Sequence, residues 1–568
     1  MLHPILDLSN FNVVLTVLSL YILLFGYISL QFKQRWYLGE ALPAFLVGVS
    51  FGPFGAKFLN VSQWGGEEAE ERSEITYALT RLVIGIQLVK VGYQLPKRYI
   101  KQRSIELTFC LLPLMGIGWI ITSSCIMLMV PNLSFLAALI IGSCVTCTDP
   151  ILSQAIAKGP FADKYVRRHL REFISSEAGG NDGFGFTFLL LAVSLLRYAE
   201  TPANAESLRE FDLVRGIPDV LGASDVGRFG GGVGKALKHW FVEGVLYMII
   251  LGATYGALIG FMTRKLLVIA LKRRWIENES LSLVPMAIGM LVVGTCGCVG
   301  SDETLACFIA GSFLNWDGVY NSEMQARHDT FNPTLETLLN FGTFMYLGAV
   351  MPWEQFHMPH DTGITLPRLF GLGFLILVLR RIPTILLGYR FIPSICHGWT
   401  EALFMGYFGP IGIGAISYVE YARRLFPEPG ESDSEINSLT AAMTPVVYWL
   451  VLFSILVHGL SVPILNAFYK LRNVPYICDH PVEVLLLSDN EPLPNNSTAN
   501  RARHSVMVNN RFSRPPDSDD GTDDGQPEDG TAAILRRSED SASTDNDRPE
   551  SRNTIQMIDR AVDTRDIV

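Results

Sequence analysis

Long apolar runs follow one another through most of the chain and constrain its fold more than any other feature. They begin near residue 11 and continue to about residue 469 of 568. Because about 20 apolar residues in a helix cross the hydrocarbon core of a bilayer, the sequence predicts an all-α polytopic membrane protein. About thirteen transmembrane helices are expected, or twelve if the short runs beside Gly300 form one unit. The expected spans are 11–31, 39–58, 76–95, 104–130, 133–157, 172–198, 239–262, 281–299, 303–316, 332–350, 367–389, 397–421 and 441–469.

Composition supports a membrane protein and argues against several other classes. Hydrophobic residues make up 49% of the chain and charged residues 18%, which is more apolar surface than a soluble core needs. No basic field suggests a nucleic-acid partner. The stretch Gly227–Ala236 resembles a phosphate-binding loop, but Phe229 and Ala236 replace residues that such a loop requires. Cys144 and Cys147 lie in an apolar run and favour packing over a thiolate metal site. We therefore expect no ATP, no cofactor and no resident metal.

Charged loops predict the orientation of the chain in the membrane. Basic residues gather after odd-numbered spans, whereas the loop after the second span is acidic. The positive-inside rule then places the N-terminus outside and, with thirteen spans, the C-terminal segment inside. Residues 1–475 form the expected transmembrane domain. Residues 476–568 are rich in Asp, Ser, Asn, Arg and Pro and are expected to be a disordered cytoplasmic tail.

Two expected spans are interrupted by polar or helix-breaking residues. In the fifth span, the polar cluster 146–149 runs into Pro150, which disfavours helix at Asp149. In the twelfth span, Gly409, Pro410 and Gly412 loosen the middle of the run. A pair of broken spans in corresponding halves of a chain points to a transporter built from inverted repeats. Two proline-kinked structural helices are the alternative.

Ionisable residues inside the sixth span need a compensating role. A charged residue such as Asp182 at the centre of a helix costs about 3 kcal/mol on insertion scales. Glu177 and Asn181 are four residues apart and share a helix face. Arg380 or Arg381 in the eleventh span is the obvious partner for Glu177, and the sequence does not decide between them. Asp182 then faces a cavity, unless it is a structural carboxylate satisfied by hydrogen bonds.

Asp302 and Glu303 begin the ninth span directly after Gly300 and Ser301. One interpretation is an entrance that attracts cations. A solvated turn between two spans explains the same residues.

Together these residues resemble the monovalent cation/proton antiporter-1 family, with the best fit to the fungal plasma-membrane sodium/proton antiporters. The resemblance covers about residues 11 to 475. It rests on Thr148-Asp149-Pro150, Glu177, Asn181-Asp182, Gly300-Ser301-Asp302, Arg380-Arg381-Ile-Pro383 and Phe408-Gly-Pro-Ile-Gly. It implies an inverted-repeat fold with two crossed broken helices, and a homodimer. The core bundle would be 104–198 and 367–469, and the dimerisation bundle 11–95 and 240–350.

The resemblance also implies roles for individual residues. Asp182 would bind a cation or a proton in competition, with Asp149, Thr148 and Asn181 beside it. Glu177 would pair with an arginine of the eleventh span. The implied function is secondary transport at the plasma membrane, in which cytosolic Na⁺, and by the same chemistry K⁺ or Li⁺, exchanges for external H⁺ by alternating access.

The same residues can also be compared with what proteins of other classes require. An enzyme is not expected. The main alternative is an intramembrane aspartyl hydrolase in which Asp149 and Asp182 form the catalytic pair. The proline and glycine interruptions fit such an enzyme less well than they fit a transporter.

Overall fold

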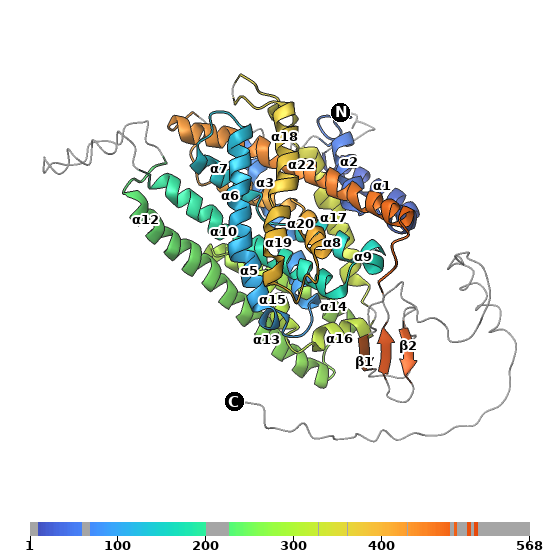
Figure 1. Ribbon diagram of the computed structural model, residues 1–568. Coiled ribbons are helices and arrows are strands. Elements are labelled where there is room, and N and C mark those ends of the chain that lie inside the picture. Colours follow the sequence, from blue (N-terminus) through green and yellow to red (C-terminus); the bar gives the residue numbers. More distant parts are fainter. Residues whose placement is uncertain are drawn as a thin grey trace, which may run out of the picture. The chain divides into compact units, whose positions relative to one another are not determined.

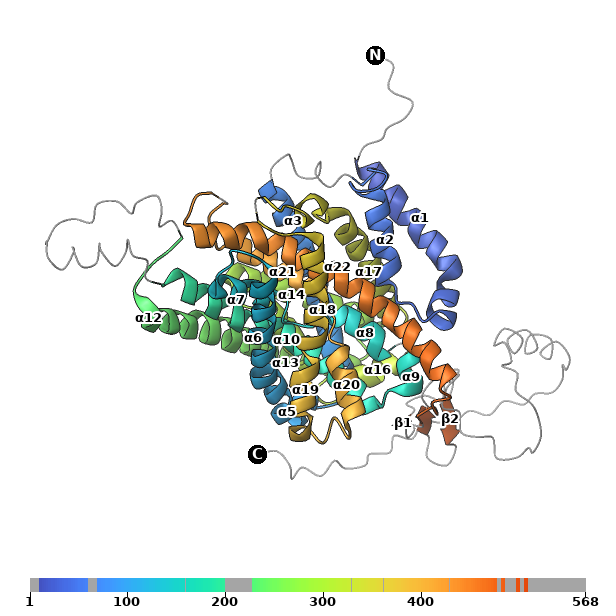
Figure 2. The same ribbon diagram turned by 45° about the horizontal axis from the view of Figure 1, so that its top comes forward.

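Helices dominate the part of the chain that the computed structural model describes, which is residues 10–59, 69–158, 160–199, 227–327, 329–360, 362–428, 430–477, 482–485, 497–500 and 505–508. All of these residues belong to one compact unit, Met1–Arg514. Figures 1 and 2 show the arrangement of the helices in two views. The first half of the unit contains α1 (Asn10–Leu30), η1 (Gln31–Arg35), α2 (Ala41–Phe51), α3 (Ala69–Gln94), α4 (Tyr99–Gln102), α5 (Ser104–Phe109), η3 (Cys110–Leu114), α6 (Met115–Met129), α7 (Phe135–Cys144), α8 (Pro150–Lys158), α9 (Pro160–Tyr165) and α10 (Arg168–Arg197).

The helices after residue 227 complete the membrane domain. They are α12 (Gly232–His239), η4 (Trp240–Leu251), α13 (Gly252–Lys272), α14 (Asn278–Val299), α15 (Glu303–Leu314), α16 (Val319–Ala326), α17 (Phe331–Val350), η5 (Trp353–Phe356), α18 (Leu366–Leu379), α19 (Ile382–Gly388), η6 (Tyr389–Phe391), α20 (Trp399–Tyr407), α21 (Ile413–Arg423) and α22 (Ser434–Leu471).

Within the described residues, eight helices are long and apolar enough to cross a membrane. They are Asn12–Ser29, Glu71–Gln94, Ser104–Met129, Arg168–Arg197, Gly232–Lys272, Asn278–Val299, Leu366–Phe391 and Ser434–Leu471. Shorter apolar helices cover Ala41–Phe51, Phe135–Cys144 and Glu303–Leu314. The expected class, a polytopic helical membrane protein, is confirmed, whereas the number thirteen stays a prediction.

The seventh expected span is longer than the sequence analysis indicated. We expected 239–262 in the membrane and 200–238 in a loop. The structure instead has one helical stretch from Gly232 to Lys272, visible along one side of Figure 1 as α12 and α13. The helix begins directly after Gly231, whose φ of 104° is a left-handed conformation that glycine adopts without strain. Residues 200–226 lie outside the described ranges.

Two sets of helices pack mainly among themselves. In the first set, α3 packs on α14 and α15, α13 packs on α15, and α17 packs on α2. In the second set, α7 contacts α6, α10, α21 and α22, and α6 runs beside α18 (Figures 1 and 2). The sets meet where α10 contacts α15 and where α21 contacts α3. Their division into dimerisation and core bundles stays a prediction.

Small residues allow α13 to approach α15 closely. Gly256 and Gly260 are four residues apart on α13, and a Cβ at either position would collide with the backbone of Ala306 or Ala310. This small-residue spacing is typical of helix pairs in membranes, where close backbone contact replaces the hydrophobic effect as a source of stability.

A buried arginine holds the segment after residue 227 against the start of α22. Arg228 donates to the carboxylates of Asp433 and Glu435 and to the backbone carbonyl of Leu196 (3.0 Å). Asp433 also caps α22, because its side chain accepts from the backbone amides of Glu435 and Ile436. Burial alone would raise the pKa of Asp433, but these hydrogen bonds and the Arg228 charge lower it overall.

Three short strands lie in the segment that we expected to be disordered. They are β1 (Val482–Leu485), β2 (Ser497–Asn500) and β3 (Ser505–Val508), and they form an antiparallel sheet in the order β1-β3-β2. In the register, Val482 pairs with Val508 and Val484 with Val506. Branched residues of this kind favour strands. The disordered cytoplasmic tail stays a prediction. The remaining residues from 478 onward lie outside the described ranges.

Candidate ion-binding site

Two helices are each interrupted by a non-helical segment, and the two segments meet. The chain leaves helical conformation between Cys144 and Pro150, and again between Tyr407 and Ile413. The two non-helical segments, 145–149 and 408–412, are called the crossover here. They are joined directly, because the Asp149 amide donates to the carbonyl of Pro410 at 2.9 Å. Inside a bilayer, non-helical backbone is tolerated only where it is buried in protein or lines a wet cavity.

The helix breaks arise from the residues that the sequence analysis named. Pro150 begins α8, a position at which its missing N–H needs no partner. Pro410 lies in the second break with Gly409 on one side and Gly412 two residues beyond. A Cβ on Gly412 would overlap the Asp149 carboxylate. Gly412 is therefore required for Asp149 to reach α21.

Asp149 caps two helices at once. Its Oδ1 accepts from the amides of Ile151 (2.7 Å) and Leu152 (3.1 Å) at the start of α8. Its Oδ2 accepts from the amide of Ile413 (2.5 Å) at the start of α21. Since the first amides of a helix lack intrahelical partners and carry partial positive charge, a single buried carboxylate stabilises both half-helices.

Whereas Asp149 accepts from backbone amides, Arg380 donates to backbone carbonyls of the crossover. Its guanidinium donates to the carbonyls of Val145 (2.6 Å), Cys147 (3.3 Å) and Gly409. These carbonyls follow the ends of α7 and α20, where intrahelical hydrogen bonding stops. Asp149 and Arg380 thus compensate the positive and negative helix ends that the breaks expose.

Replacement of Asp149 tests this double cap. Asp149→Ala should lower the free energy of unfolding by about 1–4 kcal/mol, because removal of one N-cap costs about 0.5–2 kcal/mol and Asp149 caps two helices. Asp149→Asn retains one acceptor oxygen and should lose less. Unfolding of the purified protein in detergent, followed by intrinsic fluorescence, measures both. Ser134→Ala is the matched control, since Ser134 caps only α7 through the amide of Ala137. Equal losses for Asp149→Ala and Ser134→Ala would refute the double cap.

Asn181 connects α10 to the first broken segment. Its Oδ1 accepts from the amide of Thr148 at 3.1 Å, and its Nδ2 donates to Thr148 Oγ1 at 2.7 Å and to Glu177 Oε1 at 3.4 Å. The polar atoms of Thr148 and Asn181 are therefore engaged with each other, and both residues are buried. Thr148, Asn181 and Asp149 are all in the region proposed for ion binding, but here each makes structural hydrogen bonds.

The structure pairs Glu177 with Arg381 rather than with Arg380. Both terminal nitrogens of Arg381 donate to the Glu177 carboxylate, one of them at 2.8 Å. Arg381 Nε also donates to the carbonyl of Met405 at 3.2 Å. The pair joins α10 to the junction of α18 and α19. Such two-pronged geometry makes the pair both strong and directional.

Asp182 differs from the other acids of the site. It is 1% exposed, and neither carboxylate oxygen accepts a hydrogen bond from any residue in the described ranges. Its backbone carbonyl accepts from the hydroxyl of Tyr418. Gly414 leaves space beside the carboxylate, because a Cβ there would lie 2.8 Å from Asp182 Oδ1. Asp149 and Asp302 are neighbouring acids that act on Asp182. Since buried polar groups are nearly always hydrogen-bonded, this carboxyl is available for a ligand.

Asp302 and Glu303 are buried at the start of α15. They are 2% and 7% exposed. Asp302 caps α15, with Oδ1 accepting from the amides of Thr304 and Leu305 at 2.9 and 3.1 Å. Glu303 pairs with Arg81 of α3. A solvated turn does not fit this burial, because α3 and α13 pack on α15. The entrance that attracts cations stays a prediction.

A buried acid that the sequence analysis missed lies beside a cavity. Glu420 of α21 is 2% exposed and accepts from Ser73 Oγ (2.5 Å) and from the Tyr448 hydroxyl (2.8 Å). It lines a cavity of about 700 Å³ between α3, α21 and α22, with Arg72 and Arg423 also in the wall. The sequence could have indicated this residue, since Glu420 is an acidic residue inside the expected span 397–421.

Taken together, the helical membrane fold, the pair of broken helices and the buried acid that has no partner among the described residues are typical of secondary transporters. The sequence profile described as "Sodium/hydrogen exchanger, transmembrane" matches residues 20–467. The chain belongs to this family.

Curated relatives carry names that agree with this family. A probable Na⁺/H⁺ antiporter of Schizosaccharomyces pombe is 33% identical over 467 residues, which is 80% of this chain and 56% of the relative. A Na⁺/H⁺ antiporter of Saccharomyces cerevisiae is 31% identical over 473 residues, covering 81% and 44%. The chain thus spans about half the length of these relatives. These relatives are transporters rather than enzymes, which argues against the aspartyl hydrolase.

A solved structure shares the fold. The sodium proton antiporter MjNhaP1 from Methanocaldococcus jannaschii superposes with a TM-score of 0.53 at 14% identity, covering 81% of this chain and 98% of that chain. At this identity the likeness supports the fold alone.

Proposed function

We propose that this protein exchanges Na⁺ for H⁺ across a membrane and that Asp182 is the group for which the two ions compete. The observation that carries the proposal is the Asp182 carboxyl, which is buried and without a hydrogen-bond partner among the described residues. An ionised carboxylate in such surroundings is unfavourable. A bound proton or a bound cation removes the net charge, so the same site accepts either ion but not both.

The oxygen-rich surroundings favour an alkali cation. Carboxylate, hydroxyl and carbonyl oxygens are the ligands that hard cations prefer. Asp149, Thr148 and Asn181 are the neighbours proposed to contribute oxygen atoms. Each oxygen has more than one lone pair, so a hydrogen-bonded oxygen can still face a cation. The same ligands suit Li⁺ and, with a wider site, K⁺.

The proposed transport cycle is alternating access. The bundle that contains the crossover would move only when Asp182 is neutralised, so that each crossing carries a cation or a proton. The cavity beside Glu420 is the proposed external approach, because α3 begins and α21 ends on the side that the positive-inside rule assigns to the exterior. On this orientation the C-terminal segment is cytoplasmic. We further propose a homodimer in the plasma membrane that expels Na⁺ in exchange for entering H⁺.

Reconstitution of the full chain tests the proposed exchange. Proteoliposomes with an imposed pH gradient and a pH-sensitive dye should show gradient dissipation when Na⁺ is added, with Li⁺ and K⁺ assayed separately. Protein-free liposomes are the control for leakage, and the membrane potential should be clamped so that only coupled exchange is recorded. Transport of ²²Na⁺ that proceeds without any accompanying pH change would refute the proposal.

A further inference from the structure

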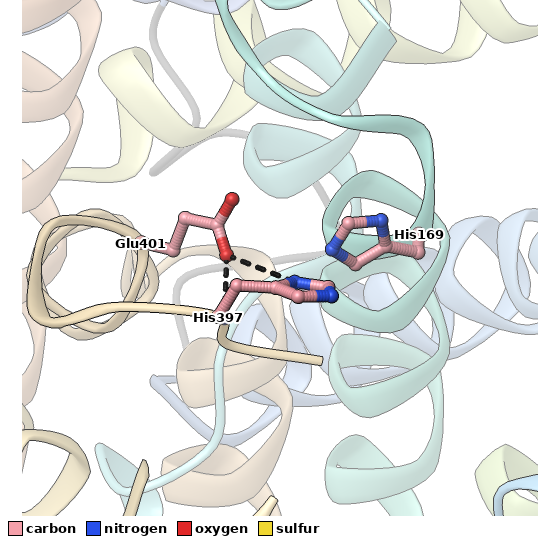
Figure 3. Close-up of side chains that lie close together, drawn as sticks. All are labelled: His169, His397 and Glu401. Atoms are coloured by element: carbon pink, nitrogen blue, oxygen red, sulfur yellow. Dashed lines mark hydrogen bonds and ion pairs between the residues drawn. The ribbon is translucent and has the colours of Figure 1, made fainter. Parts of the chain in front are cut away.

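Two histidines and a glutamate gather away from the crossover, at the start of two helices. His169 lies in the first turn of α10, His397 precedes α20, and Glu401 lies in the first turn of α20. One possible ligand atom from each of the three side chains lies within 4.8 Å of the other two. Figure 3 shows the ring of His169 facing His397 and Glu401. Neither the sequence analysis nor the proposed transport cycle assigns these residues a role.

One ring nitrogen of His169 is placed so that it can bind a metal ion. This nitrogen, Nε2, is inaccessible to solvent and has no hydrogen-bond partner among the described residues. The backbone of Ile395 also interacts with the ring. In metal sites, a histidine that binds through one nitrogen almost always donates the other N–H to a carbonyl or carboxylate, which fixes the tautomer and the ring orientation.

His397 and Glu401 are oriented toward each other by the turn that begins α20. Glu401 Oε2 accepts from the backbone amide of His397 at 2.7 Å and lies 3.5 Å from its Nδ1. The side chain of His397 is 52% exposed and that of Glu401 is 19% exposed. Solvent can therefore reach the cluster on one side, while His169 closes the other.

We propose that His169, His397 and Glu401 form a binding site for a divalent transition metal of the Zn²⁺ class. Two imidazoles and one carboxylate, with water in the fourth position, are a common open coordination set for this ion. Na⁺, Mg²⁺ and Ca²⁺ fit such a site poorly, because these ions prefer oxygen ligands to imidazole nitrogen. The site would join the start of α20, which leads into the crossover, to the start of α10.

The site must contract slightly to hold the metal. Tetrahedral ligands at about 2.0–2.1 Å from Zn²⁺ lie roughly 3.4 Å from one another, so the separations of up to 4.8 Å must shorten. The exposed ring of His397 can move inward because Gly398 follows it. Arg167, which pairs with Glu401 at 3.5 Å, is the competing cation and must be displaced.

Metal titration of the full chain, purified in detergent without a polyhistidine tag, tests the site. Zn²⁺ is titrated by calorimetry, and Co²⁺ by its visible absorption, which reports tetrahedral coordination directly. We expect one high-affinity equivalent that His169→Ala, His397→Ala and Glu401→Gln each weaken by at least about 10-fold. Arg167→Ala should strengthen binding. Binding should weaken below about pH 6.5, where free histidine becomes protonated and cannot bind metal.

The chain contains a matched control for this experiment. His239 and Glu243 form a similar pair, four residues apart, at 3.1 Å. His239→Ala should leave the high-affinity equivalent unchanged. If His169→Ala binds Co²⁺ like the unmodified protein, or if only His239→Ala loses the equivalent, the proposal is wrong. The outcome is independent of the proposed transport, because Asp182→Asn should bind the metal with unchanged affinity.

Discussion

Asp182→Asn is expected to reduce cation-dependent proton exchange to the level of protein-free liposomes. Asparagine has nearly the same shape as aspartate, but it cannot take up a proton at physiological pH and cannot offer a negative charge to a cation. The protein should still fold. Because Asp182 makes no side-chain hydrogen bond with the described residues, its replacement removes a buried ionisable group without breaking a contact. Thermal stability should be equal to that of the unmodified protein or higher.

The measurement pairs proteoliposome exchange with thermal unfolding of the same preparation. Asp433→Asn is the matched control, since it makes the same substitution at an aspartate that caps α22 away from the crossover. It should retain exchange. Near-normal exchange by a folded Asp182→Asn variant would eliminate Asp182 as the competing group. A variant that unfolds at markedly lower temperature would instead show that Asp182 is a structural carboxylate.

The second large effect is expected at the Glu177–Arg381 pair, and it is an effect on stability. Glu177→Gln leaves Arg381 buried without its counter-charge, as the two side chains are only 6% and 13% exposed. Breaking one partner of a buried pair costs about 3–5 kcal/mol. The double variant Glu177→Gln/Arg381→Met should lose less than the sum of the single variants, because it leaves no unpaired charge.

A surface pair on the same helix is the control for this prediction. Arg168 and Glu172 are 49% and 24% exposed and lie four residues apart. Glu172→Gln should therefore change the free energy of unfolding by only about 0.3–0.5 kcal/mol. Unfolding curves of the four variants in detergent give the comparison. If Glu177→Gln unfolds like Glu172→Gln yet no longer transports, the pair has a functional role instead of the structural role assigned to it.

The sequence predicts where the two helices break. It does not predict which residues form hydrogen bonds with the backbone amides and carbonyls that the breaks leave without helical partners. Pro150 and Pro410 indicate local loss of helix from chemistry alone. That Asp149 accepts from the amide of Ile413, 264 residues away, depends on the tertiary approach of two segments. For this reason Asp149 was expected only as an ion-binding neighbour, whereas the structure gives its oxygens to two helix ends.

The sequence also could not show which of Arg380 and Arg381 pairs with Glu177. In a continuous helix, adjacent residues point about 100° apart, and either could have faced Glu177. The structure breaks the helix between Leu379 and Ile382, so that Arg380 turns to the crossover carbonyls and Arg381 turns to Glu177. Pro383, at the start of α19, was the available hint of this break.

Burial of Glu303 and Glu420 was missed for a related reason. Both residues lie near the ends of expected spans, where hydropathy alone suggests contact with water. Their partners, Arg81 and Ser73, belong to a helix more than two hundred residues earlier in the chain. Side-chain pairing over such distances is set by helix packing and leaves no local pattern.

The double cap by Asp149 has a consequence for biosynthesis. The ribosome adds about 5–20 residues per second, so the amide of Ile413 emerges tens of seconds after Asp149. During that interval the newly made first half holds an acid and several backbone groups whose partners do not yet exist, in or next to the translocon. Completion of the crossover must therefore be a late step of assembly, and chains that stall before residue 413 should be recognised by membrane quality control.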